Sequence, residues 1–338
     1  MARAVRLADV ASRAGVSLAT ASRVLNGSDR TVGEALRKRV LAAAEELSYS
    51  PNTHAQAMAR GASNILGLIV HDIADPYFGA IASGVIAKAD ETGTVVLLAN
   101  TGRDPEREVQ YVAMLRAQRA RAVIIAGSRW DDPEQQRRLS EQLQAYVAGG
   151  GRVSCISQNR LGTTTVLAEN RAGAKALGRQ LAEMGHRRFA VLAGPKRLLT
   201  ARDRLQGFRE GVREHGGEVV EVRHGPFTRD GGYETARDLL RSGTDATCLF
   251  AVNDVMAVGA MAACREEGVA VPDDLSVAGF DDIETLRDVA PALTTVRLPL
   301  VEMGERAASL ALDGEDGPTI VRVKGEVILR DSTAAPRA

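Results

Sequence analysis

Short, almost wholly apolar segments alternate with amphipathic helical patterns over most of this chain, from Asn64 onward. The apolar segments are ILGLIV, TVVLLA, RAVIIAG and RVSCIS in the first half, and FAVLAG, EVVEV, ATCLFAV and LSVAGF in the second. Among the intervening stretches, Tyr77 to Thr92 has the clearest helical period. Strands that are apolar on both faces and separated by helices indicate parallel sheets covered by helices on each side. The two runs predict two α/β lobes.

The ends of these strands are the expected place for a ligand, because open parallel sheets bind ligands beyond the carboxyl ends of their strands. The segments that follow the strands are rich in Asp, Asn, Arg and aromatic residues, which suit a polyhydroxylated ligand. Polar residues at strand ends are also common in plain turns. The candidate segments are 72–78, 100–104, 127–130, 157–160, 194–204, 253–254 and 279–282.

The first residues of the chain have a different pattern, LADVASRAGVSLATASRVLN. Leu7, Val10 and Ala11 form one apolar helical face, and Gly15 suits the left-handed residue that ends a helix. Ser17 is a good N-cap for a second helix. The pattern predicts a helix-turn-helix, although the same hairpin also occurs as a packed corner of helical domains.

On the second helix, Ala21, Val24 and Leu25 form the inward face. Leu18, Ala19, Ser22 and Arg23 then point outward. In a helix-turn-helix, outward residues at the start of the second helix contact base edges.

A T-x-x-E capping box at Thr31 and Glu34 predicts a third helix. Its expected core residues are Leu36, Val40, Leu41, Ala44 and Leu47. Pro51 ends this region, and residues 53–60 have helix-forming composition but span only about two turns, too short for a helix that is stable alone.

Composition is that of a globular protein, with 45% hydrophobic and 25% charged residues and a net charge of zero. Residues 1–60 carry nine Lys or Arg and five Asp or Glu, so they have a charge of +4 and the remainder −4. A basic module on a mildly acidic body suits binding to a polyanion through one end. We expect a cytoplasmic protein, because we find neither a signal peptide nor an apolar run approaching roughly 18 residues.

The sequence shows no pattern typical of a catalytic or metal-binding site. The three cysteines show no spacing typical of a disulfide framework or zinc site, and no Walker A, G-x-S-x-G or H-E-x-x-H motif occurs. We therefore expect no enzyme, no cofactor and no metal. The five histidines are scattered and are interpreted as surface or turn residues: His54, His71, His186, His215 and His224.

The segments LADVASRAGVS, TASRVLNG, SYSPN and AQAMA resemble the DNA-binding headpiece of the LacI/GalR family of bacterial transcriptional regulators. The resemblance continues through DPYF, AGPKRLLTARDRLQGF, AVNDVMAVGAM and VAGFDD, so it covers the whole chain. It implies an all-α helix-turn-helix headpiece followed by an α/β core that is like periplasmic binding proteins, with two doubly wound parallel-sheet lobes.

The resemblance also implies roles at the DNA. Leu18, Ala19 and Arg23 match residues that contact bases, while Ser17, Thr20, Ser22 and Asn26 match residues that help to hold phosphates. Residues 53–60 match a hinge helix that folds when two copies meet in the minor groove. Met58 takes the place of the usual wedging Leu. The alternative for this segment is a disordered linker.

In the cleft between the lobes, the resemblance implies a set of effector-binding residues: Tyr77, Phe78, Thr200, Arg204, Phe227, Asn253 and Asp281. Two positions depart from the family pattern. Ser157 stands where sugar-binding members often have Asp, and Leu198 stands where purine-responsive members have a ligand-contacting Arg. These departures argue against a purine and separate the chain from typical hexose-binding members.

These observations predict a homodimeric DNA-binding regulator, expected to be a repressor, that binds a pseudo-palindromic double-stranded operator and responds to a sugar-like effector. Control by a protein co-regulator is the alternative, and a sugar-metabolising α/β enzyme is a remote one. The expected divisions are a headpiece (1–50), a hinge (51–62), a first lobe (63–158 with 294–322), a second lobe (159–293 with 323–332) and a tail (333–338). Segments 159–171, 288–296 and 319–330 are expected to cross between the lobes.

Overall fold

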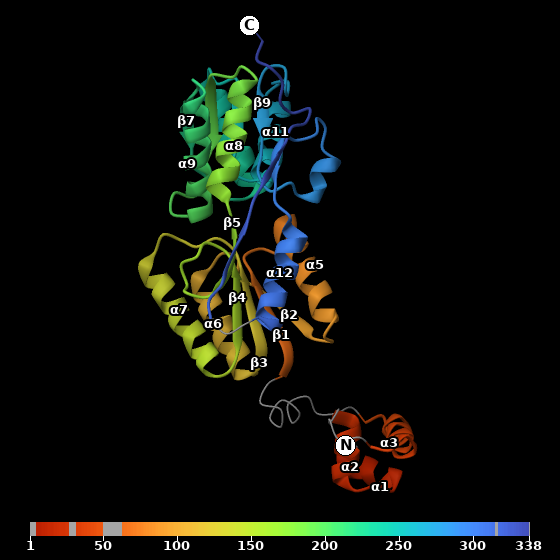
Figure 1. Ribbon diagram of the computed structural model, residues 1–338. Coiled ribbons are helices and arrows are strands. Elements are labelled where there is room, and N and C mark those ends of the chain that lie inside the picture. Colours follow the sequence, from red (N-terminus) through yellow and green to blue (C-terminus); the bar gives the residue numbers. More distant parts are fainter. Residues whose placement is uncertain (1–4, 27–31, 50–62, 315–316, 338) are drawn as a thin grey trace. The chain divides into compact units, whose positions relative to one another are not determined.

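The structure is a computed structural model that describes residues 5–26, 32–49, 63–314 and 317–337 (Figure 1). Its internal contacts divide the chain into two units, Met1–Asn64 and Ile65–Ala338. None of the described helices is long and apolar enough to span a membrane.

The described part of the first unit contains α1 (Leu7–Ala14), α2 (Leu18–Asn26) and α3 (Glu34–Glu46). Gly15 ends α1 in the left-handed region at φ 63°, as predicted. Arg39 of α3 donates hydrogen bonds to the carbonyl oxygens of Ala14 and Gly15, which are left without helical partners at this helix end. The left-handed conformation of Gly15 and the hydrogen bonds from Arg39 therefore both stabilise the turn of the helix-turn-helix.

The third helix differs from its prediction in two respects. It begins at Glu34 with Gly33 as its N-cap, and Thr31 lies outside the described residues. Leu36 and Leu41 are exposed, because Val40, Ala43 and Ala44 form the buried face of α3. The residues 51–62 predicted as the hinge also lie outside the described part of the chain.

The first lobe of the second unit is built on a sheet with strand order β11-β5-β4-β3-β1-β2. Its strands are β1 (Ser63–Val70), β2 (Val95–Asn100), β3 (Ala120–Ala126), β4 (Arg152–Ile156), β5 (Thr164–Ala168) and β11 (Ile320–Val323). Its helices are α5 (Pro76–Asp90), α6 (Pro105–Ala117), α7 (Pro133–Ala148) and α12 (Leu300–Asp313).

Both faces of this sheet are covered, which explains its continuous apolar strands. Leu66, Leu68 and Val70 of β1 pack in one core with α5 and α12, whereas Ile69 belongs to a second core with α6 and α7. Successive side chains of a strand point to opposite faces, so each face needs its own apolar residues.

The second lobe has the parallel strand order β7-β6-β8-β9. Its strands are β6 (Arg188–Leu192), β7 (Glu218–Arg223), β8 (Cys248–Ala251) and β9 (Ser276–Ala278). Its helices are α8 (Asn170–Glu183), α9 (Leu199–Glu214), α10 (Arg229–Ser242), α11 (Asp254–Glu266) and a 3₁₀ helix (Glu284–Arg287).

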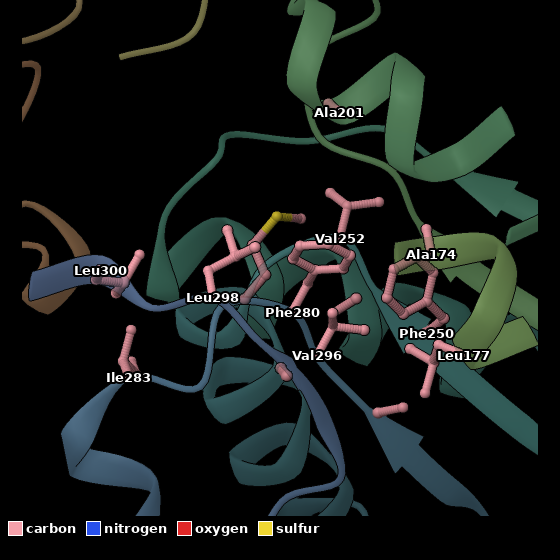
Figure 2. Packing of buried hydrophobic residues seen from close by; sticks show 14 of the residues in the cluster. Ala174, Leu177, Ala201, Phe250, Val252, Phe280, Ile283, Val296, Leu298 and Leu300 are labelled. Atoms are coloured by element: carbon pink, nitrogen blue, oxygen red, sulfur yellow. The ribbon is translucent and has the colours of Figure 1, made fainter. Parts of the chain in front are cut away.

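The chain passes between the lobes three times, as expected. β5 leads into α8, β10 (Thr295–Arg297) leads into α12, and β11 leads into β12 (Glu326–Ile328), which pairs antiparallel with β10. Figure 2 shows part of the core that spans this region, with Phe250 and Phe280 of the second lobe and Val296, Leu298 and Leu300 from β10 to the start of α12.

One expected division of the chain is wrong. The first lobe does not end at residue 158, because β5 pairs with β4 and β11 within the first sheet. The expected tail begins at Thr333, which is buried, and the Ala334 amide donates to Ser276 Oγ (3.1 Å). The last strand of the second sheet is thus covered by the end of the chain.

Candidate functional sites

The outer surface of α2 is the candidate DNA-contacting surface. Leu18, Ala19 and Arg23 are exposed, and Ala21 is fully buried, as the helical pattern predicts. The Arg23 guanidinium makes no hydrogen bond or ion pair to another described residue. An exposed guanidinium on the outer face of such a helix has the chemistry needed for guanine O6 and N7.

The remaining residues of this surface help to build the helix itself. Ser17 Oγ accepts a hydrogen bond from the Thr20 amide (3.1 Å) and lies 2.9 Å from Thr20 Oγ1, which confirms Ser17 as the N-cap. Ser22 is half-buried. Asn26 is the last residue of α2, and Met58 lies outside the described residues.

The candidate effector site is a cavity between the two lobes of the second unit. It contains about 410 Å³ of unfilled space, part of it open to solvent. All the residues expected at the effector line it: Tyr77, Phe78, Thr200, Arg204, Phe227, Asn253 and Asp281. They come from both lobes and from five separate segments of the chain.

Arg204 on α9 and Asp281 after β9 form a buried ion pair in this cavity. The two terminal nitrogens of Arg204 donate to the two carboxylate oxygens of Asp281 at 2.6 and 3.2 Å. Arg204 also donates to Asn170 Oδ1 (2.8 Å) and to the Val252 carbonyl (2.7 Å), and its Cζ lies 3.9 Å from the centre of the Phe280 ring. The guanidinium is therefore held rigidly, with one N–H left for a ligand.

Two buried carboxyl groups, Asp281 of this pair and Asp254 at the start of α11, have raised pKa values. Burial raises the pKa of Asp281 to about 7, although the charge of Arg204 opposes the change. Burial also raises the pKa of Asp254 to about 6. Asp254 accepts hydrogen bonds from Thr295 Oγ1 (2.6 Å) and the Ile283 amide (3.0 Å), and it does not line the cavity.

The other expected residues offer one polar amide and three aromatic rings. Asn253 caps α11 through Oδ1, which accepts from the Met256 amide (3.1 Å), so its NH₂ group remains for the cavity. Phe78 is buried and lies edge-to-face with Tyr77. The half-buried Phe227 enters the cavity from the second lobe, and Arg103 of the first lobe lies 5.5 Å from its ring centre.

A strip of contacts beside the cavity joins the two lobes. The Thr200 amide donates to Ser128 Oγ (3.0 Å), and Thr200 Oγ1 accepts from Gln158 Nε2 (2.7 Å). The loop after β3 and the start of α9 add an ion pair between Asp131 and Arg202 (2.7 Å). Thr200 is therefore both a cavity residue and a contact between lobes.

Comparison with known proteins places these features in a family. Residues 6–52 match the model of bacterial regulatory proteins of the lacI family, and residues 179–333 match a periplasmic binding protein-like domain. The chain is 36% identical to the HTH-type transcriptional regulator GalR of Escherichia coli K12, over 95% of this chain and 93% of that protein. The chain belongs to the LacI family. Its members are helix-turn-helix transcriptional regulators, not enzymes.

Two solved structures of the LacI family cover nearly the whole chain. The lac repressor dimer bound to operator and the anti-inducer ONPF has a TM-score of 0.83 at 28% identity, covering 98% of this chain and 100% of that chain. The complex of the transcriptional regulator CelR with cellobiose has a TM-score of 0.71 at 30% identity, covering 97% of this chain and 99% of that chain.

Some residues of this LacI-family cavity were not among those expected. Five further lining residues lie within the strand-end segments that were predicted from the sequence as ligand-binding: Asp75, Arg103, Gly127, Ser128 and Leu198. His71, directly after β1, also lines the cavity but lies outside those segments. The interpretation of all histidines as surface or turn residues is wrong for His71 and His186, which are buried.

Proposed function

We propose that this chain is a homodimeric repressor whose affinity for a pseudo-palindromic operator is controlled by a sugar-like effector in the interlobe cavity. The observation that carries the proposal is the meeting of rigid polar groups and aromatic rings from both lobes in one cavity. The relatives named above support it, because one was solved with operator and the other with cellobiose.

At the DNA, Arg23 would be the main hydrogen-bonding reader, since its guanidinium is exposed and Leu18 and Ala19 offer mainly apolar contacts. Ser17, Thr20, Ser22 and Asn26 would contact phosphates, and Met58 of each copy would wedge into the central base step. Such a dimer would act in the cytoplasm, beside the nucleoid.

In the cavity, Arg204, Asp281 and Asn253 would contact ligand hydroxyls, with Thr200 and Tyr77 as further polar groups. The Phe227 and Phe78 rings would pack against the C–H faces of a sugar. Charged groups that are held by neighbours before the ligand arrives lose little entropy on binding and discriminate hydroxyl patterns by geometry.

An exposed apolar surface on the first lobe supports the dimer. It lies along both faces of β2, the edge strand of the sheet: Leu98 is on the same face as Ile86 of α5, and Val95 and Leu97 are on the opposite face, with Val95 64% exposed. Apolar side chains gathered along a sheet edge favour association, and a second copy of the same surface is the simplest partner.

The contacts between the two lobes would couple the effector cavity to the DNA-binding segments. Because three chain crossings allow the lobes to rotate, a ligand that favours one lobe angle would change the spacing of the paired DNA-binding segments. The Thr200 contacts lie where such a rotation would make or break them.

A thermal-shift screen of D-galactose, D-ribose, cellobiose and related sugars tests the effector site. At least one sugar should stabilise the wild-type chain, and Phe227→Ala should abolish that shift. Tyr233→Ala, which alters an aromatic residue of the same lobe outside the cavity, should retain it. An equal shift in both variants would place the sugar elsewhere, and the absence of any shift would favour a protein co-regulator.

Footprinting on the DNA upstream of the gene tests the proposed DNA-binding surface. We expect protection of two half-sites related by a dyad, with affinity that falls as salt rises. Binding without a dyad, or binding insensitive to salt, would contradict the proposal.

A further inference from the structure

His71 follows directly after β1 and lines the interlobe cavity, yet it is only 4% exposed. Its ring packs against the main chain of Gly127, at the end of β3. A Cβ at Gly127 would lie 2.5 Å from His71 Cε1, and the φ of 149° there is also unfavourable for other residues. The sequence thus leaves space for this ring at the edge of the cavity.

Behind the ring lies a buried ion pair between Glu108 of α6 and Arg129. Arg129 donates from its two terminal nitrogens to the two oxygens of Glu108, at 2.8 and 2.7 Å. Burial alone would raise the pKa of Glu108, but Arg129 and the hydrogen bonds hold it well below its ordinary value. Glu108 is therefore a carboxylate at neutral pH, and it only accepts hydrogen bonds.

The hydrogen-bond partners determine which nitrogen of His71 carries the proton. His71 Nε2 lies 3.2 Å from Glu108 Oε1 and 3.4 Å from Arg129 NH2. Both protons of that Arg129 nitrogen are already directed, one at Glu108 Oε1 (2.7 Å) and one at the Gly127 carbonyl (3.3 Å). The Arg129 contact is the longer of the two and its protons have other acceptors, whereas the Glu108 carboxylate can only accept, so this geometry favours Nε2 as the donor to Glu108.

Protonation of both ring nitrogens is disfavoured. Burial lowers the pKa of His71, and the charges of Arg129 and Arg103 act in the same direction, although Glu108 opposes them. A neutral ring with a proton on Nε2 has a lone pair on Nδ1. Among the described residues, Nδ1 has no hydrogen-bond partner.

We propose that His71 is a specificity-determining residue of the cavity, whose Nδ1 accepts a hydrogen bond from a hydroxyl group of the effector. Glu108 and Arg129 are the positioning residues that hold the ring in the Nε2–H tautomer. This inference rests on the proposed function and names a further group that selects the effector.

The other polar groups of the first lobe at or beside this cavity already have partners: Asp75 accepts from the Tyr77 amide (3.1 Å) and lies 3.9 Å from the Arg103 guanidinium. Ser157, at the end of β4, directs its hydroxyl to the Gly127 carbonyl (2.7 Å) and accepts from Arg129 Nε (3.1 Å), and it does not line the cavity. Ser128 Oγ accepts from the Thr200 amide. His71 Nδ1 therefore adds an acceptor on the side of the cavity opposite to Arg204 and Asp281, suited to a ligand with hydroxyls at both ends.

The tautomer can be measured directly in the full-length protein with ¹⁵N-labelled histidine. At pH 7.5 the two nitrogens of His71, assigned by their loss in His71→Gln, should give a protonated Nε2 signal and an unprotonated Nδ1 signal. A proton on Nδ1, or a doubly protonated ring, would overturn the proposal without reference to any ligand.

Two substitutions separate recognition from structural support. Glutamine places its amide near the position of Nε2 and keeps a donor for Glu108, whereas asparagine places its amide near the position of Nδ1 and keeps an acceptor for the ligand. For the sugar that stabilises the wild-type chain in the screen above, His71→Gln should weaken binding about 5- to 150-fold, the range for one lost buried hydrogen bond. His71→Asn should retain tighter binding than His71→Gln, with a lower Tm.

The reverse order of binding, or wild-type affinity in His71→Gln, would show that the histidine only supports Glu108, and the inference would be wrong while the proposed function stands. If no sugar of the panel stabilises the wild-type chain, the proposed effector class itself is wrong, and this inference fails with it.

Discussion

Replacing Arg204 with methionine removes the cation from the buried pair in the cavity and keeps much of the side-chain volume. Arg204 is only 2% exposed, and its partners are Asp281, Asn170 and the Val252 carbonyl. Breaking a buried ion pair costs about 3–5 kcal/mol, because the remaining charge is left unpaired. For a unit of this size, 1 kcal/mol changes Tm by roughly 2–4 °C, so we expect a loss of about 6–20 °C.

The pH dependence of this loss has a definite sign. Burial raises the pKa of Asp281 to about 7, so below that pH the carboxyl group is protonated in the folded state and loses little when Arg204 is absent. Above about pH 7 the wild-type Asp281 carboxylate is ionised and paired with Arg204. In the variant, Asp281 must either carry an unpaired buried charge or stay protonated at a pH where the unfolded chain has released that proton, and both alternatives lower stability. The difference in Tm between wild type and variant should therefore widen from pH 6 to pH 8.5.

Differential scanning calorimetry across this pH range measures the effect. Arg209→Met is the matched control, because Arg209 lies exposed on the same helix, and it should change Tm little at any pH. The reasoning is refuted if Arg204→Met lowers Tm no more than Arg209→Met, or if the difference from wild type narrows as pH rises.

Three further predictions concern other parts of the chain. Arg23→Ala should weaken operator binding by about 1–3 kcal/mol in a fluorescence-anisotropy titration, and Arg37→Ala, which removes the same charge from α3, should cost clearly less; equal losses would mean that Arg23 contributes only charge. Val95→Asp should shift the protein toward monomer in sedimentation velocity, and an unchanged dimer would exclude the β2 edge as the interface. Burial raises the pKa of Asp254 to about 6, so its contribution to the free energy of unfolding is present below roughly pH 4 and is lost as pH rises through 6. The Tm of Asp254→Asn should therefore fall less than the Tm of the wild type between pH 5 and pH 7. Parallel Tm profiles of the two proteins would contradict this prediction.

The regular elements of both lobes could be predicted from the sequence because their patterns are local. β1 and β3 are apolar at every buried position, and α5 has its apolar residues at helical spacing, so each pattern by itself determines the type of element. The end of the first lobe could not be found this way. β5 belongs to the first sheet only because it pairs with β4 and with β11, a strand more than 150 residues later in the chain.

The same distinction holds at the cavity. Arg204, Asn253 and Asp281 were expected because they lie within family motifs, but the ion pair between Arg204 and Asp281 depends on distances that no motif contains. His71 was misinterpreted because a lone histidine has no sequence partner, and Glu108, the residue that gives it a role, lies 37 positions away on α6. Its place directly after an apolar strand was the available signal.

Leu36 and Leu41 illustrate the limit of periodicity in a short domain. Both fit an apolar helical pattern on α3, but only a narrow face formed by Val40, Ala43 and Ala44 meets α1 and α2, so the two leucines remain exposed. The number of neighbours available to a helix in so small a unit decides its burial more than its pattern does.

The proposed control of operator affinity by an effector requires that the cavity and the DNA-binding surface are thermodynamically coupled. The most direct measurement is the operator dissociation constant of the full chain, by fluorescence anisotropy, without and with a saturating concentration of the sugar found in the screen. Coupling of about 1–3 kcal/mol predicts a change of roughly 5- to 150-fold in that constant, lost in Phe227→Ala and kept in Tyr233→Ala. An operator affinity that is the same with and without bound sugar would contradict the account.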